Sequence, residues 1–251
     1  QQLYNTADTL IVGNFCGTQS LAAVGATGAF VQLLVVIFVG LCSGAGVVVA
    51  QSYGACDVEE VDRQVHTALA MAPLGGALLT VLGLVSSRFV LQLMDTPAEI
   101  LGEATIYLQI YFLGMIPQFL YNMGTNILRA VGDSKRPLYF LIIASLVNIV
   151  LDVVFVAAFH WGVAGAAIAT VISPVASAVL TIRCLAGSNG MPWHPRADQL
   201  RPDANTTGHI CRLGLPSAVQ SALYSPRKLS LQAPLNAIGP NPLSARGLYA
   251  Q

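Results

Sequence analysis

Residues 20–54 read SLAAVGATGAFVQLLVVIFVGLCSGAGVVVAQSYG, a stretch without a single charged side chain. A transmembrane helix needs about 20 predominantly apolar residues, so this stretch is long enough to cross a bilayer. The rest of the chain is similar: 55% of its 251 residues are hydrophobic and 10% are charged, with a mean hydropathy of +0.66. Soluble domains carry about 25% charged residues. We therefore predict an all-α integral membrane protein in contact with a lipid bilayer.

Charged residues and turn signals divide the remaining sequence into further apolar segments. The cluster from Asp57 to Arg63 is expected to be a polar loop, and Pro117 is expected to break a fourth helix in its middle. Proline is tolerated inside membrane helices where neighbours satisfy the freed carbonyl. The expected helices are residues 3–15, 20–54, 64–87, 99–129, 137–159 and about 163–184, with a seventh apolar segment from residue 209.

The polar stretch 187–208 is expected to link two parts of the chain. Residues 1–186 form the expected amino-terminal six-helix lobe, with helix one truncated, and residues 209–251 a remnant of a second lobe. A partial repeat supports this division, because five residues near the start recur near the end at one constant offset: Asn14, Gly17, Leu21, Ala23 and Gly25 as Asn236, Gly239, Leu243, Ala245 and Gly247. Two related halves are typical of transporters. Coincidence among small residues is the alternative.

Basic residues predict the orientation of the chain. Turns after the even-numbered helices hold eight of them and turns after the odd-numbered helices hold only Arg88. Because cytoplasmic loops carry an excess of lysine and arginine, the even-numbered loops are expected to be cytoplasmic and the protein to lie in the inner (plasma) membrane. The eight residues are Arg63, Arg129, Lys135, Arg136, Arg183, Arg196, Arg201 and Arg212.

Two acidic residues fall inside expected membrane helices, Asp8 and Asp152. A carboxylate in hydrocarbon costs about 2.5 to 3.5 kcal/mol on insertion scales, so it is expected to face a cavity, bind a cation or take up a proton. Asn148 lies one turn before Asp152, and Tyr4 one turn before Asp8, so each pair shares a helix face.

Thr170 lies in the middle of the next helix, which is joined to Asp152's helix by a very short turn. Together the five residues supply two carboxylates, one amide and two hydroxyls, which suits sodium or a shared proton. The alternative is structural: Asp8 would lie at a water-exposed helix end and Asp152 at a bend.

Other polar residues in the expected helices are predicted to line an aqueous cavity, and the alternative is that they form interhelical hydrogen bonds. They are Gln32, Gln118, Asn122 and Asn126. The five cysteines and four histidines are dispersed, so we expect no catalytic residue, no cofactor and no metal beyond a possible sodium ion. A formal net charge of zero gives no basic excess for binding nucleic acid.

Several motifs, taken together and in order, resemble the multidrug and toxic compound extrusion (MATE) transporters of prokaryotes, the DinF and NorM-like branch. They are YNTADTLIVG at residues 4–13, LAAVG at 21–25, LRAVGDSKRP at 128–137, NIVLD at 148–152, GAAIAT at 165–170 and LGLPS at 213–217. The resemblance implies twelve helices in two lobes and efflux of amphipathic or cationic small molecules, driven by protons or sodium. It also implies that Tyr4, Asp8, Asn148, Asp152 and Thr170 form a cation site.

The chain departs from this pattern at its ends. It starts inside the first helix and stops within the seventh and eighth, and Pro226, Arg227 and Lys228 interrupt the expected seventh helix. We therefore expect a partial chain that needs the missing lobe or a second copy for activity. The alternatives are a lipid-linked oligosaccharide flippase of the same superfamily, which would carry more cationic cavity residues, and an intramembrane aspartyl protease, whose GxGD motif is missing around Asp8 and Asp152.

Overall fold

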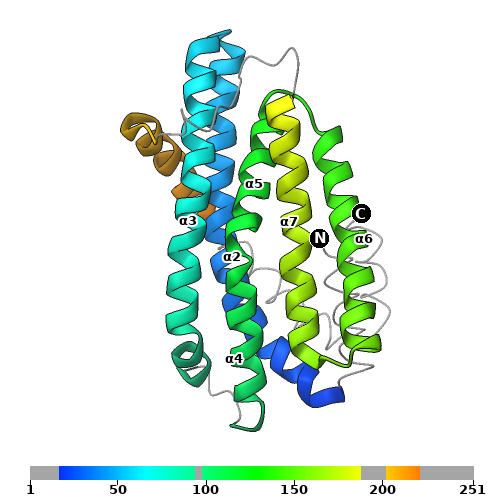
Figure 1. Cartoon of the computed structure of the whole chain (residues 1–251). Helices are drawn as coiled ribbons and strands as arrows, with labels where there is room; N and C mark the ends of the chain where they lie inside the picture. Colours follow the sequence, from blue (N-terminus) through cyan, green and yellow to red (C-terminus); the bar gives the residue numbers. More distant parts are fainter. Residues whose placement is uncertain (1–16, 94–97, 188–201, 221–251) are drawn as a thin grey trace, which may run out of the picture.

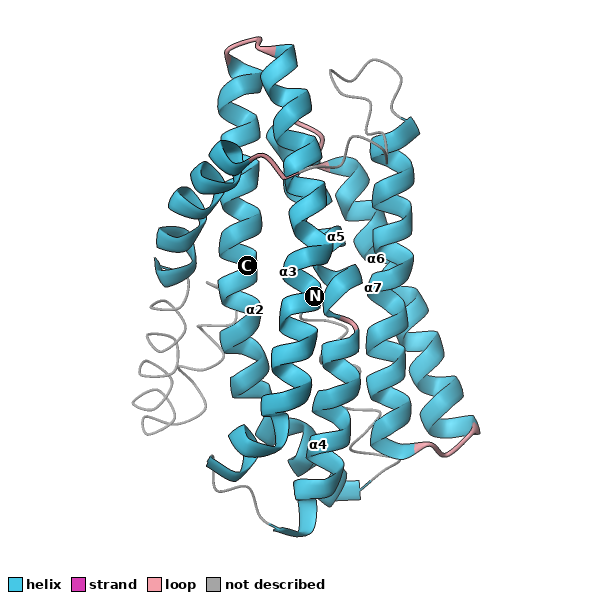
Figure 2. Ribbon diagram, turned by 60° about the vertical axis from the view of Figure 1, so that its left-hand side comes forward, coloured by secondary structure: helices cyan, strands magenta, loops and turns pink. Residues whose placement is uncertain are grey.

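A computed structural model describes residues 17–93, 98–187 and 202–220, and in these ranges the chain is a bundle of helices without a strand (Figures 1 and 2). This confirms the predicted all-α class. The helices are α2 (Gly17–Gly54), α3 (Val58–Leu93), α4 (Ala98–Leu113), α5 (Met115–Ala130), α6 (Lys135–Asp152), the π-helix η1 (Val153–Ala158) and α7 (Gly162–Gly187). A further helix covers residues 204–220.

Three of the described helical segments are long and apolar enough to cross a membrane, judged by length and composition. They are Val58–Leu93, Lys135–Val156 and Ala164–Gly187. A large part of their apolar surface faces outward, as on α3, where one face presents Leu74, Leu78, Val81, Leu82, Val85 and Phe89. Water does not favour such a surface, whereas lipid tails match it. The outward faces therefore fit a protein solvated by lipid.

The acidic cluster after α2 begins a helix and is not the polar loop that we predicted. α3 starts at Val58 and carries Glu59 and Glu60 in its first turn. The Asp57 carboxylate accepts a hydrogen bond of 3.1 Å from the backbone N–H of Glu60. Negative side chains at a helix N-terminus accept hydrogen bonds from its unpaired N–H groups and interact favourably with the positive end of the helix dipole. They therefore favour the start of a helix here. Figure 1 shows the resulting α2–α3 tip extending beyond the other helices.

The predicted break in the fourth helix is confirmed, but it lies at Gly114 and not at Pro117. Proline has no N–H for the carbonyl four residues earlier, and its ring clashes with that carbonyl, which here belongs to Leu113. α4 accordingly ends at Leu113. α5 then starts at Met115 and holds Pro117 in its first turn, where a missing N–H costs little.

The fifth predicted helix, 137–159, changes its geometry at Asp152. α6 ends there, and the π-helix η1 continues over Val153–Ala158. A left-handed His160 (φ 56°) and Gly162 (φ 60°) then make the short turn into α7. π-helical turns are rare and are frequent at functional sites. The sequence analysis did not anticipate one next to this acid.

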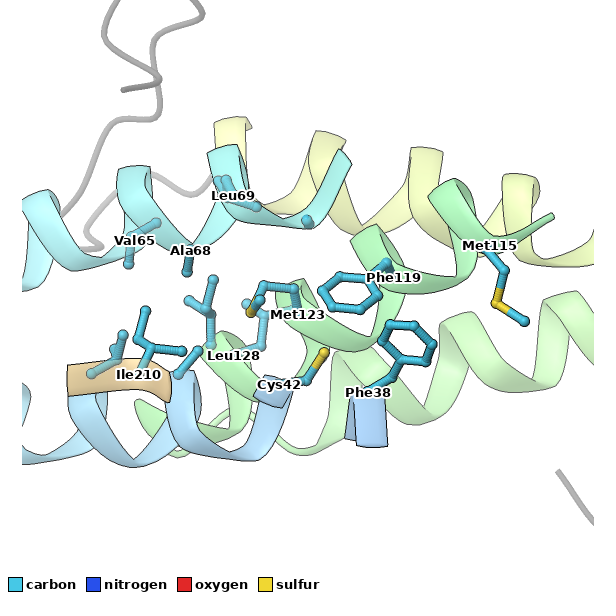
Figure 3. Packing of buried hydrophobic residues seen from close by; sticks show 14 of the residues in the cluster. Phe38, Cys42, Val65, Ala68, Leu69, Met115, Phe119, Met123, Leu128 and Ile210 are labelled. Carbon is cyan, nitrogen blue, oxygen red and sulfur yellow. The ribbon is translucent and has the colours of Figure 1, made fainter. Parts of the chain in front are cut away.

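The apolar core lies where α5 packs between α2, α3 and α7. Phe38 of α2 meets Phe119 of α5 edge to face, with ring centroids 4.7 Å apart. Figure 3 shows this pair beside Cys42 and Met123, with Ile210 of the 204–220 helix closing the cluster. This core fixes α5, and α5 in turn positions the polar residues on its opposite face.

The 204–220 helix begins inside the stretch that we predicted as a linker. Its first turn is capped by Asp203, whose carboxylate accepts 2.8 Å hydrogen bonds from the Thr206 N–H and hydroxyl. The Asp203 N–H in turn donates to the Thr67 hydroxyl of α3 (3.3 Å). The missed signal is an aspartate three residues before a threonine, a common N-terminal cap.

Candidate functional site

Asp152 and Asn148 lie one turn apart on α6 and are both buried. Asp152 is 0% exposed and Asn148 1%. Within the described part of the chain, neither amide atom of Asn148 has a hydrogen-bond partner. A buried amide that makes no hydrogen bond costs about 1–3 kcal/mol, so an unsatisfied native amide calls for an explanation such as a bound ion or water.

A small pocket connects Asn148 to the neighbouring helices. Its volume is about 20 Å³, enough for roughly one water molecule. The lining combines α5, α6 and α7: Gln118, Tyr121, Leu141, Ala144, Asn148, Thr170, Ser173, Pro174 and Ser177. The structure thus brings Asn148, Thr170 and Gln118 of the predicted residues together, while Asp152 lies one turn further along the buried face of α6.

The α7 hydroxyl groups of this pocket donate their protons to carbonyls of their own helix. The Thr170 hydroxyl donates to the Ala166 carbonyl (2.9 Å) and the Ser173 hydroxyl to the Ala169 carbonyl (2.7 Å). A hydroxyl that donates its proton keeps oxygen lone pairs for accepting another one. The pocket therefore presents acceptor oxygens, which suits a proton-donating water, a hydronium ion or a small hard cation.

The remaining predicted residues have different positions. Tyr4 and Asp8 lie outside the described residues, as does the side chain of Gln32. Asn122 and Asn126 are partly buried on α5 and donate to the carbonyls of Gln118 (2.8 Å) and Asn122 (2.9 Å) of their own helix. Their role as cavity residues stays a prediction.

Tyr121, Ser173 and Ser177 belong to the pocket but were not among our predicted site residues. On α7, Thr170, Ser173 and Ser177 follow one another at spacings of three and four, which places them on one helix face. Hydroxyls on one face of an otherwise apolar membrane helix are the signal that would have identified them.

The MatE family profile matches residues 1–154. A probable multidrug resistance protein of Bacillus subtilis, YoeA, is 31% identical over 248 residues, which cover 96% of this chain and 54% of that protein. A probable multidrug resistance protein of Thermotoga maritima, NorM, is 24% identical over 230 residues, 90% of this chain and 49% of that protein. The chain spans about half the length of these curated relatives.

A solved structure described as MATE in the bent conformation superimposes with a TM-score of 0.80 and 29% identity. The match covers 86% of this chain and 48% of that chain. A six-helix lobe with the start of a second is the part of a larger transporter that such coverage fits.

Proposed function

The chain belongs to the MatE family, and from this premise we propose that it is the ion-coupling lobe of a multidrug efflux antiporter. The transporter would exchange protons or sodium ions for amphipathic or cationic small molecules across the plasma membrane. The missing second lobe, or a second copy of this chain, would complete the central cavity. No step of this exchange makes or breaks a covalent bond in the substrate, so the protein would act as a transporter and not as an enzyme.

The observation that carries the proposal is the burial of Asp152 beside Asn148 in a helix long enough to span a membrane. A carboxylate in such a position is expensive, and proteins retain it where it binds a cation or exchanges a proton. Asn148, one turn before Asp152, lines the same pocket as Thr170 and the other acceptor oxygens. This arrangement supports an ion site, to which Tyr4 and Asp8 of the first helix would add a hydroxyl and a second carboxylate.

Coupling follows if the two ligands prefer different conformations of the lobe. Binding of a proton or sodium ion at Asp8 and Asp152 would stabilise one state, and binding of the drug in the central cavity would stabilise the other. A ligand shifts an equilibrium only by its difference in affinity for the two states. The π-helix that begins directly after Asp152 is a candidate for the element that changes, because π-turns and α-turns differ by a single inserted residue.

The orientation is also a proposal. Arg129, Lys135 and Arg136 flank the turn at residues 131–134, and Arg183, Arg196 and Arg201 lie near the end of α7 or in the segment that follows it. The positive-inside rule would place this end of the bundle in the cytoplasm and the 159–161 turn outside.

Ethidium efflux tests the proposal. Energised vesicles containing the chain would be compared with vesicles containing the Bacillus subtilis relative YoeA, while the proton and sodium gradients are collapsed separately. We expect efflux that is lost with one gradient and lost in Asp152→Asn, but kept in Glu103→Gln, which makes the same chemical change at an exposed acid of α4.

Efflux that survives loss of both gradients, or that persists in Asp152→Asn, would contradict ion coupling at this site. No efflux from the chain, with YoeA active in parallel, would contradict the idea that two copies suffice. The ion site would then be tested by the dependence of Trp161 fluorescence on pH and on sodium.

A further inference from the structure

A line of hydroxyl groups, partly buried at Thr170 and buried beyond it, continues from the pocket along α7. Thr170, Ser173, Ser177 and Thr181 follow at spacings of three and four, so they share one face of the helix. Ser177 is 2% exposed and Thr181 0%. We call these four residues the hydroxyl column.

The hydroxyl column lies inside the lobe and not on its surface. α7 packs against α5 on one side and against α6 on the other. A Cβ added at Gly124 of α5 would stand 2.3 Å from Thr181 Cγ2, so α5 packs tightly against α7 at this threonine. A route along the column would therefore run between helices of one lobe and not through a central cavity between two lobes.

The hydroxyl column ends near three polar residues, Cys184, Arg136 and Asp133, which we call the Cys184 mouth. Cys184 lies three residues after Thr181, and its sulfur accepts a hydrogen bond of 3.5 Å from the exposed Arg136 guanidinium. Arg136 also pairs with Asp133 (3.3 Å). This end carries the 131–134 turn and the start of the inter-lobe segment, which the proposed orientation places in the cytoplasm. Along the line, the titratable and charged residues of the described chain are Asp152, Tyr121, Cys184, Arg129, Asp133 and Arg136.

Two buried groups on this line lack a partner among the described residues: the Asn148 amide and the Thr181 hydroxyl. Ordinary packing explains a serine or threonine that bonds back to its own helix, as Ser173 and Ser177 do. It does not explain an unsatisfied amide that lines a water-sized pocket, or an unsatisfied hydroxyl one turn beyond Ser177, the last pocket residue of α7. Water bound in the pocket would satisfy the Asn148 amide.

We propose that the hydroxyl column and its pocket hold water that carries protons between Asp152 and the cytoplasmic face. This inference rests on the proposed function and deepens it, because it makes the coupling ion a proton. Hydroxyl groups and an enclosed water pass a proton on by exchange, whereas a sodium ion would need an open path, and the pocket has a volume of only about 20 Å³. A proton that leaves Asp152 passes to water held by Asn148, and the resulting hydronium returns a proton to bulk water at the Cys184 mouth. The O–H bond of protonated Asp152 breaks and an O–H bond of water forms. Each oxygen in between gains one proton and gives one up, so Asp152 is left as a carboxylate and bulk water gains one proton.

Time-resolved infrared spectroscopy tests the route on the full chain in inside-out and right-side-out vesicles. A photolysed caged compound releases protons on one face, and the carbonyl band of protonated Asp152, identified by its loss in Asp152→Asn, is followed. Ser177→Ala and Thr181→Val each remove one hydroxyl with little change of volume. We expect both variants to slow the rise of the band by at least about tenfold from the cytoplasmic face only.

The control is Ser86→Ala, which removes an exposed hydroxyl that bonds to its own helix in α3 (2.6 Å to the Leu82 carbonyl). It should leave the rate unchanged, and Ser86→Ala and Thr181→Val, which lie outside the pocket, should keep the parent chain's equilibrium titration. Unchanged rates in both Ser177→Ala and Thr181→Val, with a normal Asp152 band, would rule out the hydroxyl column as the proton route and leave the proposed ion site standing. Absence of a titrating Asp152 band from the parent chain would overturn the proposed ion site, and the route with it.

Discussion

Gly44 of α2 lies against the backbone of Gly214 in the 204–220 helix, so that a Cβ on Gly44 would stand 2.6 Å from the Gly214 nitrogen. Gly40 makes the same kind of approach to Ala218, where a Cβ would stand 2.4 Å from the alanine Cβ. Small residues four apart let two membrane helices approach closely. This contact joins the first helix of the second segment to the amino-terminal lobe.

Gly44→Ala should therefore destabilise the chain. The added methyl has no space and would push the two helices apart, at a cost of about 1–3 kcal/mol for overpacking. The measurement is the apparent melting temperature of the purified chain by circular dichroism. Gly54→Ala is the matched control, because nothing lies within 4 Å of a Cβ at Gly54. Equal melting temperatures for the two variants would show that the close contact does not exist.

Ion binding at Asp152 should change the fluorescence of Trp161. The π-helix after Asp152 carries Phe155, whose ring stacks on Trp161 with centroids 5.1 Å apart. Of the two tryptophans, Trp193 is removed as Trp193→Phe so that only Trp161 reports. We expect fluorescence to change with pH, or with sodium at fixed pH, in this background and in Glu103→Gln. The same change in Asp152→Asn would contradict binding at this acid.

The cap of the 204–220 helix should weaken only in acid. Hydrogen bonds from the Thr206 N–H, and then from its hydroxyl, hold the pKa of Asp203 below its ordinary value. A carboxyl whose pKa is lowered on folding stabilises the fold above its unfolded pKa of about 3.9, and this contribution is lost as the pH falls through the lower folded value.

Amide hydrogen exchange of residues 206 and 207, corrected for the intrinsic pH dependence, measures this effect. Asp203→Ala should exchange several-fold faster at every pH, because it removes the cap. Asp203→Asn should keep protection near neutrality and lose its pH dependence, since asparagine caps a helix without titrating. Pronounced loss of protection between pH 6 and 5 in the parent chain would run against the sign of the pKa shift.

Truncation to alanine should destabilise the protein much more at a core phenylalanine than at a lipid-facing one. Phe119 is buried against Phe38, so Phe119→Ala should cost roughly 3–5 kcal/mol. Phe89 is 66% exposed on α3, and Phe89→Ala should cost little in a bilayer, because lipid is as apolar as the side chain that it replaces. Unfolding in bicelles measures both. Similar losses would mean that α3 packs against protein on the Phe89 face.

Helix positions and fold class were largely predictable because they depend on local chemistry. An uncharged run long enough to cross a bilayer predicted α2, and Pro117 predicted a break close to the end of α4. The free-energy cost of a carboxylate in a membrane helix indicated that Asp152 needs a function. The errors were also local: Asp57 and Asp203 each cap a helix where we predicted loop or linker, since side-chain hydrogen bonds to backbone N–H groups outweigh polarity as a guide to helix starts.

The sequence by itself therefore determined an apolar helical membrane protein with two acids, Asp8 and Asp152, that need a functional explanation. Only the tertiary structure decided which residues line the pocket at Asn148, one turn from Asp152. Tyr121, Asn148 and Ser177 come from three helices, and their meeting depends on how α5, α6 and α7 pack. Helix periodicity places residues on a face, whereas the contacts between faces follow from side-chain volumes along the whole interface, which no short stretch of sequence contains.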